Sequence, residues 1–387
     1  MKNLISNIKM KRRLENISYK NRTVKKNFDS IIISGKKLFN LSSNDYLSLS
    51  KNREIINESK KWLETYGTSL SSSRLVSGNL DKISVIESMI SKFIGKEKSL
   101  IFSGGFLMNS TLIPTLTGNN LGQRNKVEIF SDKLNHASIN YGCYLTRQKV
   151  SRYNHLDLNH LDYLLKKTNR KTPKFIISET LFSMDGDLVN VDELRVIAKK
   201  YNAVLYLDEA HSLGVYGKNG SGCSFGKKYE KEIVVGTFGK SFGSFGSFAS
   251  ASEECINKII NSCGGLIYTT ALPPSVYASI NAALKIIPKL NKERKNLLEN
   301  SKFLKTKLNS LNVDTGNTQS QIIPMIIKDE KKCLKLKKSL ENAGFFLKVI
   351  KSPTVSKGTE RIRLSLTSSM KTKSLNEFCE LIKNYSD

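Results

Sequence analysis

The chain has 387 residues, 39% of them apolar and 25% charged, which predicts a soluble globular protein with one large domain and a smaller one. A formal net charge of +28 would suit a nucleic-acid or membrane-surface partner, but the basic residues are spread along the chain, so we expect neither partner. The six cysteines form no CxxC pair or metal-like spacing, and no apolar run could cross a membrane, which predicts a cytoplasmic protein without disulfides or a bound metal.

Residues 1–50 are expected to form an N-terminal arm. Leu4, Ile5, Ile8 and Leu14 recur at helical spacing, which favours an amphipathic first helix over an organelle presequence. The basic start has no apolar h-region, so it is not typical of a secretory signal.

Residues 51–285 are expected to form the large domain, because short apolar runs alternate there with helical patterns. The clearest runs are KSLIFSGG, KVEIFSD, KFIISET, AVLYLDEAH and EIVVGTFGK. Runs that are apolar on both faces suit a buried parallel sheet, and the alternation predicts a doubly wound α/β domain with helices on both faces. Such sheets bind ligands at the C-terminal ends of their strands, where the chemically distinctive residues of this chain occur.

Residues 286–387 are expected to form a smaller C-terminal α+β domain. In this part the runs QIIPMIIK, GFFLKVIK and RIRLSLTS alternate with helices such as EKKCLKLKKSLENAG. No internal repeat or low-complexity linker separates the two predicted domains.

The first chemical signals along the chain follow the first three apolar runs. Gly104 and Gly105 open a helix, where exposed backbone N–H groups could bind a phosphate. His136, in SDKLNHASI, could stack on a planar cofactor ring, and Ser183, in ETLFSMDGD, adds a hydroxyl donor to the same edge. Each signal is weak by itself, since Gly-rich turns and structural histidines are common.

Asp208 ends an apolar strand, where a carboxylate is costly unless it has a partner. A protonated pyridine nitrogen would be such a partner, and the carboxylate would keep that ring cationic and able to store electrons. His211 lies three residues further on and could hydrogen-bond a phenolic oxygen of the same ring. The letters DEAH also occur in a helicase box, but the chain has no GxxxxGK[ST] phosphate loop.

Lys240 follows the run EIVV and is flanked by Gly and Ser, which let a ligand approach the backbone closely. A lysine amine can condense with a carbonyl if desolvation or its neighbours lower its pKa. Thr237 adds a second hydroxyl to this edge. In a chain so rich in lysine, a solvated loop lysine is the alternative interpretation.

With these motifs in order, the chain resembles the α-oxoamine synthases, which are fold-type I pyridoxal-phosphate enzymes. The resemblance covers nearly the whole length. The matching segments are LSSNDYLSLS, SSSRLVSGN, FSGGF, DKLNHASI, ETLFSMDGD, DEAHSLGVYG, TFGKSFG, LIYTTALPPS and SPTVSKGTERIRLSLT. SSNDYL, SRLVSG and RIRLSLT most resemble the 8-amino-7-oxononanoate synthase branch, which belongs to biotin biosynthesis.

The resemblance implies a role for each matched residue. Lys240 would be the Schiff-base lysine that holds pyridoxal 5′-phosphate, Asp208 would pair with its pyridine nitrogen, His211 with its phenolic oxygen, and His136 would stack on its ring. The further residues that would contact the cofactor or its phosphate are Gly105, Phe106, Ser183, Thr237, Thr269 and Thr270. Thr269 and Thr270 match residues supplied by a second subunit, so the resemblance implies a homodimer with shared active sites.

The resemblance also implies substrate residues. Arg363 matches an arginine that binds the amino-acid carboxylate, which suits a bidentate fork. Asn44 and Thr354 match positions near the substrates, and the N-terminal substrate arginine could be Arg22, with Lys20 as the other candidate.

Two positions depart from the family pattern. Lys351 stands where the motif usually has arginine, and it offers a point charge in place of a fork. Ile83 stands where many relatives have histidine. Neither departure touches the predicted cofactor residues.

The predicted activity is the decarboxylating condensation of L-alanine with pimeloyl-CoA or a pimeloyl carrier protein, and the basic surface would favour the polyanionic coenzyme A. The alternatives within the family are glycine C-acetyltransferase, 5-aminolevulinate synthase and serine palmitoyltransferase. Outside it, the alternatives are a basic nucleic-acid-binding protein, or a relative that binds the cofactor without turnover.

Overall fold

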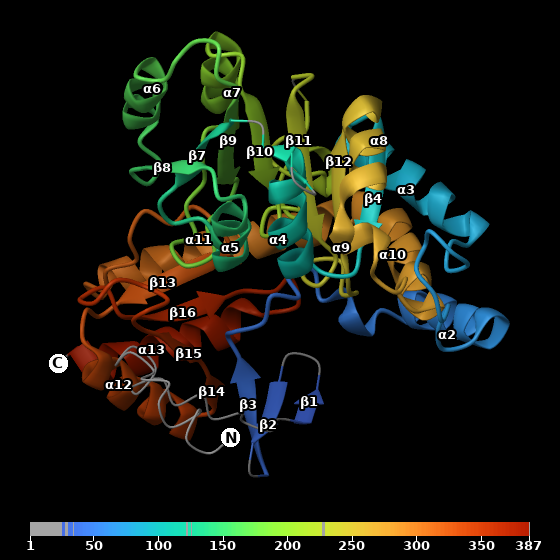
Figure 1. Cartoon of the computed structure of the whole chain (residues 1–387). Coiled ribbons are helices and arrows are strands. Elements are labelled where there is room, and N and C mark those ends of the chain that lie inside the picture. Colours follow the sequence, from blue (N-terminus) through green and yellow to red (C-terminus); the bar gives the residue numbers. More distant parts are fainter. Residues whose placement is uncertain are drawn as a thin grey trace, which may run out of the picture.

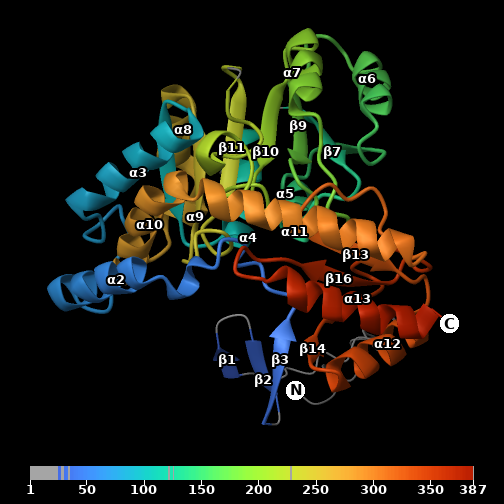
Figure 2. The same ribbon diagram turned by 180° about the vertical axis from the view of Figure 1, so that it is seen from behind.

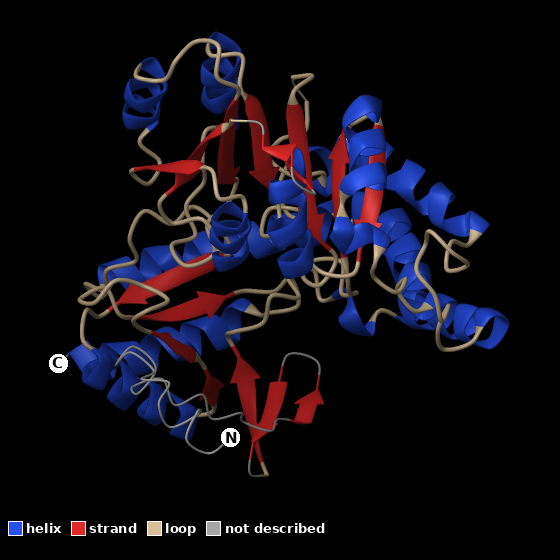
Figure 3. Cartoon of the chain, viewed as in Figure 1, coloured by secondary structure: helices blue, strands red, loops and turns tan. Residues whose placement is uncertain are grey.

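The computed structural model describes residues 25–27, 30–33, 35–120, 123–124, 126–226 and 229–386. Its largest feature is a seven-stranded sheet, drawn in red in the upper half of Figure 3. From one edge to the other the strands are β4 (Lys98–Phe102), β12 (Ser247–Ala251), β11 (Glu232–Thr237), β10 (Val204–Asp208), β9 (Lys174–Glu179), β7 (Glu128–Asp132) and β8 (Lys149–Tyr153). Only β12 runs antiparallel to its neighbours, so the predicted mostly parallel α/β sheet is confirmed.

Both faces of this sheet are buried. Successive side chains along a strand point to opposite faces, and here both sets of side chains enter apolar clusters. In β10, Leu205 and Leu207 join one apolar cluster and Tyr206 joins another. In β11, Val234 likewise packs on the face opposite to Val235. This arrangement explains why the strands are continuous apolar runs in the sequence.

Helices cover each face of the large sheet (Figure 1). On one face lie α4 (Gly105–Leu116), α5 (Ala137–Leu145), α8 (Glu253–Ser262) and α9 (Gly264–Ile267). On the other lie α2 (Arg53–Tyr66), α3 (Asp81–Ile94), α6 (Leu158–Lys166), α7 (Val191–Lys200) and α10 (Pro274–Ile286). Several of these helices begin at a side chain that accepts a backbone N–H, such as Asn52 before α2 and Asn190 before α7.

Five of the seven strands were predicted as apolar runs, and two were not. The strand β8 lies at the edge of the sheet and is only partly buried, so its sequence KVSRY lacks an apolar run. The strand β12 is buried throughout, but its sequence SFASA consists mostly of small residues with weak strand preference.

The C-terminal part forms a second, smaller layer of sheet and helices. Its three-stranded antiparallel sheet has the order β13 (Ile322–Ile326), β16 (Arg361–Ser365), β15 (Lys348–Ile350). Its helices are α11 (Asn291–Ser310), α12 (Glu330–Asn342) and α13 (Thr372–Ser386). Figure 2 shows α11 extending from the large sheet to the small one.

One predicted strand is divided between two sheets. The run GFFLKVIK contains β14 (Phe345–Phe346), which pairs with the N-terminal part, and β15, which pairs with β16. The chain leaves one sheet and enters the other at Leu347, which is fully buried.

The N-terminal arm is attached to the C-terminal part. The arm forms three consecutive antiparallel strands, β1 (Lys25–Asn27), β2 (Ser30–Ile33) and β3 (Lys36–Asn40). The strand β14 pairs with β3 in parallel and is the fourth strand of this sheet. Leu41 and Tyr46 then enter the apolar cluster of the C-terminal part. The predicted first helix lies outside the described residues, and the division at residues 50 and 285 stays a prediction.

The remaining elements are short. They are η1 (Leu49–Lys51), β5 (Asn119–Asn120), β6 (Gln123–Arg124), η2 (Lys218–Gly220) and η3 (Ile287–Lys289). Over the residues described, no helix combines the length and apolar character that a membrane crossing requires.

Candidate active site

The candidate site lies where the parallel strands of the large sheet end. Asp208 is the last residue of β10 and Glu179 the last of β9. His136 follows β7, and Lys240 follows β11. Because parallel strands end at the same edge, the fold brings together four residues that are up to 104 positions apart in the sequence (240 − 136).

The loop that carries Lys240 is held by apolar anchors and backbone bonds. Phe238 and Phe242, on either side of the lysine, are fully buried. The amide of Phe238 donates to the carbonyl of Gly246, and that of Gly243 donates to the carbonyl of Lys240, each at 2.9 Å. The side chain of Lys240 therefore projects from a fixed backbone.

Burial lowers the pKa of the Lys240 amine to about 8. The carboxyl groups of Asp208 and Glu179 act in the opposite direction but do not offset the burial, and the charge of Arg363 lowers the pKa further. Within the described part of the chain, Lys240 Nζ forms no hydrogen bond or ion pair. The amine is thus unpaired, and it loses its proton more readily than an ordinary lysine does.

Asp208 is buried and is held by hydrogen bonds from neutral donors. Its Oδ1 accepts from the amide of Ala210 at 2.9 Å, and its Oδ2 accepts from Asn109 Nδ2 at 3.0 Å. The amide of Asn109 also donates to Ser138 Oγ at 3.0 Å, and that hydroxyl lies 2.8 Å from His136 Nδ1. A continuous chain of hydrogen bonds therefore connects Asp208 with His136.

His136 is the N-cap of α5, and its Nδ1 accepts from the amide of Ser138. Its own amide donates to Glu179 Oε1 at 2.6 Å. Partial burial lowers the pKa of the His136 imidazole, Asp208 raises it, and Lys240 lowers it, with a net decrease. A neutral ring with Nδ1 as acceptor leaves its face and Nε2 available to a ligand.

Glu179 was not predicted as a site residue. Its carboxyl group is buried, and burial together with the charge of Asp208 raises its pKa well above the ordinary range. The signal was present in the sequence, because Glu179 is a charged residue at the end of an apolar strand, as Asp208 is.

His211 is connected through Tyr46 to Asn44, one of the predicted substrate residues. A hydrogen bond of 2.6 Å joins His211 Nδ1 and Tyr46 Oη, and Tyr46 Oη donates to Asn44 Oδ1 at 3.3 Å. Burial, with the charges of Lys240 and Arg363, lowers the pKa of His211 well below its usual value. Tyr46 was missed, since a tyrosine in the matched segment SSNDYL gave no sign of contact with His211.

Arg363 reaches this edge from the small sheet. Its Nε donates to the carbonyl of Ser183 at 2.5 Å, and Nη1 donates to Ser365 Oγ at 3.0 Å. Both terminal nitrogens also lie 3.3–3.4 Å from Asn44 Oδ1. The structure thus connects Arg363, Asn44 and Ser183, and through Tyr46 also His211, in one group of contacts.

The predicted phosphate residues lie at the start of α4. A Cβ atom added at Gly104 or Gly105 would meet nothing within 4 Å, so the space before this helix is open. Phe106 is exposed and packs on Tyr141 with 5.6 Å between ring centroids. Thr237 differs from the expectation, because its hydroxyl already donates to the carbonyl of Gly246 at 3.0 Å.

Several residues predicted to belong to the site have no described contact with the residues around Lys240 and Asp208. Thr270 forms a bridge with Ser73, and its neighbour Thr269 lies beside it. Thr354 is exposed between β15 and β16. Arg22 and Lys20 lie outside the described residues.

The two departures from the family pattern have different structural settings. Ile83 is fully buried in the apolar cluster between α3 and the large sheet, so it is a core residue. Lys351 pairs with Glu330 at 2.5 Å, with both side chains partly exposed. In the described residues no group of three or more His, Cys, Asp or Glu side chains is arranged to hold a metal ion.

Comparison with known proteins gives the family. Residues 36–382 match the aminotransferase class I and II model. The 8-amino-7-oxononanoate synthase of Gluconacetobacter diazotrophicus is 36% identical over 335 residues, which is 86% of this chain and 84% of that protein. A relative from Paramagnetospirillum magneticum, which carries the same name provisionally, is 41% identical over 336 residues, 87% of this chain and 85% of its own. The chain belongs to the aminotransferase class I and II family.

Solved structures agree with this assignment. The serine palmitoyltransferase of Sphingomonas wittichii is 27% identical with a TM-score of 0.87, covering 92% of this chain and 89% of that one. The 8-amino-7-oxononanoate synthase of Francisella tularensis is 28% identical with a TM-score of 0.78, covering 90% and 97%. An SPT structure that contains PLP is 25% identical with a TM-score of 0.88, covering 94% and 92%.

Proposed function

We propose that this member of the aminotransferase class I and II family is a pyridoxal-phosphate acyltransferase of the 8-amino-7-oxononanoate synthase type. It would join L-alanine to a pimeloyl thioester, carried by coenzyme A or by a carrier protein. The observation that carries the proposal is the Lys240 amine, which is unpaired, has a pKa lowered to about 8, and acts electrostatically on Asp208, Glu179 and His136.

The residues present fit pyridoxal phosphate. Asp208 is a buried carboxylate with no cation bonded to it in the described chain, as a protonated pyridine nitrogen requires. The exposed face of His136 would stack on the ring, and His211, whose Nε2 is not engaged, would bond the phenolic oxygen. The open N-terminus of α4 at Gly105 would receive the phosphate.

In such an enzyme the bound cofactor supplies an electron sink for charge that develops at the amino-acid Cα. Lys240 would bind the cofactor covalently and, once released by the substrate amine, would accept the Cα proton. A lysine with a pKa near 8 is suited to this task, because it can take up and return a proton near neutral pH. Arg363 would bind the substrate carboxylate, since its Nη2 has only a long contact with Asn44 and its Nη1 has one further bond, to Ser365 Oγ at 3.0 Å.

The proposed reaction balances without a further reactant. A carbon–carbon bond forms between the alanine Cα and the thioester carbonyl carbon, and the carbon–sulfur bond breaks to release the thiol. The alanine carboxylate leaves as carbon dioxide, and a proton takes its place at Cα. The product is 8-amino-7-oxononanoate.

The choice of branch is supported by the names of the relatives and by the motifs SSNDYL, SRLVSG and RIRLSLT. Serine palmitoyltransferase is the second candidate, because its structures superpose with the higher TM-scores. Glycine C-acetyltransferase and 5-aminolevulinate synthase are the third and fourth candidates, since both condense an amino acid with an acyl thioester. Lys351 does not favour recognition of a terminal carboxylate, since it already pairs with Glu330.

We propose in addition that the protein is a cytoplasmic homodimer. Large apolar side chains are exposed in segments that border the site, among them Phe106, Leu134, Tyr141 and Phe245, and such surfaces commonly mark protein interfaces. All six cysteines are free, which supports a reducing compartment. Light scattering coupled to size-exclusion chromatography would test the dimer, and a monomeric mass would contradict it.

The activity is tested by thiol release. Purified protein with pyridoxal phosphate, L-alanine and pimeloyl-CoA should release free thiol and form 8-amino-7-oxononanoate. Lys240→Ala should lower the rate by roughly 10²- to 10⁴-fold or more, and borohydride reduction of the wild type should attach the cofactor to the Lys240 peptide. Attachment at another lysine would overturn the proposal. Release with serine and palmitoyl-CoA, but not with alanine, would assign serine palmitoyltransferase instead.

A further inference from the structure

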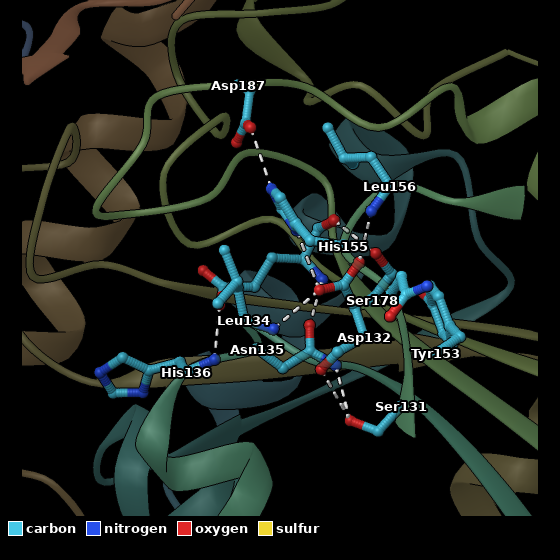
Figure 4. Close-up of polar contacts among 12 residues, drawn as sticks. Ser131, Asp132, Leu134, Asn135, His136, Tyr153, His155, Leu156, Ser178 and Asp187 are labelled. Carbon is cyan, nitrogen blue, oxygen red and sulfur yellow. Dashed lines mark hydrogen bonds and ion pairs between the residues drawn. The ribbon is translucent and has the colours of Figure 1, made fainter. Parts of the chain in front are cut away.

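His155 occupies a position that the proposed reaction does not explain. It follows β8 and precedes α6, and its imidazole lies between two carboxylates. Nδ1 is 3.0 Å from Asp132 Oδ1, and Nε2 is 2.9 Å from Asp187 Oδ2. Figure 4 shows the three side chains in a row. Since each ring nitrogen faces a carboxylate oxygen, both must donate, and the ring carries a positive charge.

The electrostatics agree with this geometry. Burial by itself lowers the pKa of His155, but hydrogen bonds to Asp132 and Asp187 and their charges raise it to about 10. Asp132 is fully buried, and Asp187 Oδ1 has no hydrogen-bond partner in the described structure. A neutral ring at this place would therefore leave two carboxylates facing each other without a cation.

Asp132 controls the turn that leads to His136. Its Oδ1 also accepts from the amide of Leu134 at 2.8 Å, and its Oδ2 accepts from the amide of Leu156 at 3.0 Å. The next residue, Asn135, bonds the β9 strand through Ile177 and Glu179. In Figure 4 the ring of His136 points away from this network while its backbone is tied to it. The position of His136 thus depends on Asp132.

Asp187 controls the loop that carries Ser183. The amide of Phe182 donates to the carbonyl of Asp187 at 3.1 Å, which closes the loop Phe182–Asp187. The ring of Phe182 packs edge-on against His155 at 4.4 Å between centroids. Ser183 lies in this loop, and its carbonyl accepts from Arg363. A displacement of Asp187 would therefore move Ser183, including the carbonyl group that accepts from Arg363.

We propose that His155 is a positioning residue, a charged clamp that sets the turn before His136 and the loop of Ser183 at one fixed separation. His136 and Ser183 are both residues of the candidate site, and the consequence of the clamp for turnover rests on the proposed function. His155 itself touches neither Lys240 nor Asp208 in the described contacts. Its effect on a ligand would be transmitted through Asp132 and Asp187.

The test compares His155→Gln with His155→Lys and with the control His160→Gln. Glutamine can bond only one of the two carboxylates and carries no charge, whereas lysine restores the charge. His160 lies five residues further on, and its Nδ1 accepts from the amide of Asn154, a bond that glutamine can replace. With the holoenzyme, kcat of H155Q should fall by roughly 10- to 100-fold, since misplacement by about 1 Å has effects of this size. H155K should retain more activity than H155Q, and H160Q should match the wild type.

Two readouts do not depend on turnover. The circular dichroism of bound pyridoxal phosphate should change in H155Q and not in H160Q, because the cofactor's surroundings shift. In the protein without cofactor, the NMR signals of His136 should move in H155Q; the chain has only four histidines, so single substitutions assign them. A wild type without thiol release would refute the proposed reaction but leave the NMR test of the clamp intact.

The clamp is refuted by a folded H155Q that keeps the wild-type kcat, cofactor dichroism and His136 signals. If H155Q does not fold, the wild type still decides the matter. Its His155 should remain protonated up to pH 8 in an NMR titration, and a titration midpoint below pH 7 would overturn the inference.

Discussion

Two clusters of buried charges lie at the same edge of the large sheet, and they differ in one respect. Around Lys240 the carboxyl groups of Asp208 and Glu179 act through space, and no ion pair joins either of them to the lysine in the described residues. Around His155 each carboxylate is in direct contact with the imidazole. The first cluster contains the candidate catalytic lysine, and the second supports the loops beside it.

The difference appears in the direction of the pKa shifts. Burial lowers the pKa of Lys240 to about 8, whereas contact with two carboxylates raises that of His155 to about 10 against the same effect of burial. Direct hydrogen bonds therefore outweigh desolvation, and attraction at longer range does not. Buried charge without a partner indicates a place prepared for a ligand, and buried charge with partners indicates a structural clamp.

Removing the carboxylate charge of Asp208, in the cluster around Lys240, should have the largest effect on activity. Asp208→Asn keeps the shape of the side chain but gives no carboxylate to a protonated ring nitrogen, so thiol release should fall by about 100-fold or more. Without Asp208 the pKa of Lys240 should also decrease further, because that carboxylate raises it. Steady-state assays at several pH values measure both effects.

The matched control is Asp162→Asn on α6. Asp162 is ion-paired with Lys200 and Lys166 at the surface and should be dispensable for activity. If D208N and D162N release thiol at equal rates, the expected difference in importance between the Asp208 carboxylate, which has no cationic partner, and the ion-paired Asp162 is contradicted.

The charge of His155 should make the free energy of unfolding depend on pH, and this effect should be intermediate in size. The pKa of His155 is raised from an ordinary value of 6.5 to about 10 in the folded protein. Its stabilisation is therefore complete below about pH 6.5 and disappears as the pH rises towards 10. His155→Gln should cost about 3 kcal/mol at pH 6, as for a buried ion pair that loses one partner, and less at pH 10. Urea unfolding at both pH values checks this, and a gap that widens with pH would refute it.

The smallest effect concerns strain beside the clamp. Leu156 has a φ of 56°, a left-handed conformation that costs a non-glycine residue about 1 kcal/mol and that Asn tolerates better. Leu156→Asn keeps the amide that bonds Asp132 but loses the packing of Leu156 against an apolar cluster, so the melting temperature should change little and activity should be unchanged. Arg147→Asn, at a φ of 54° in an exposed turn, is the control in which no apolar packing is lost, so it should show a small gain from the relief of strain. A loss of activity in L156N alone would show that strain at Leu156 serves the clamp.

Much of the fold was predictable because its strands are apolar on both faces. The five runs were visible for this reason, and the edge strand β8 and the small-residue strand β12 were not. Lys240, Asp208 and His136 were predicted because polar residues after such runs meet at one edge. Glu179 followed the same rule and was overlooked, whereas Asn109 lies within a helix and had no visible signal.

The sequence by itself determined the large parallel sheet, the family and the residues at the strand ends, because local apolar pattern and motif order carry that information. Only the tertiary structure decided which charges are paired, since pairing depends on ångström distances between residues far apart in the chain. His155 became a clamp because Asp132 and Asp187, 23 and 32 positions away, reach its two nitrogens. Lys240 stayed unpaired, whereas the two carboxyl groups that act on it electrostatically, those of Asp208 and Glu179, are bonded by Asn109, Ala210 and His136.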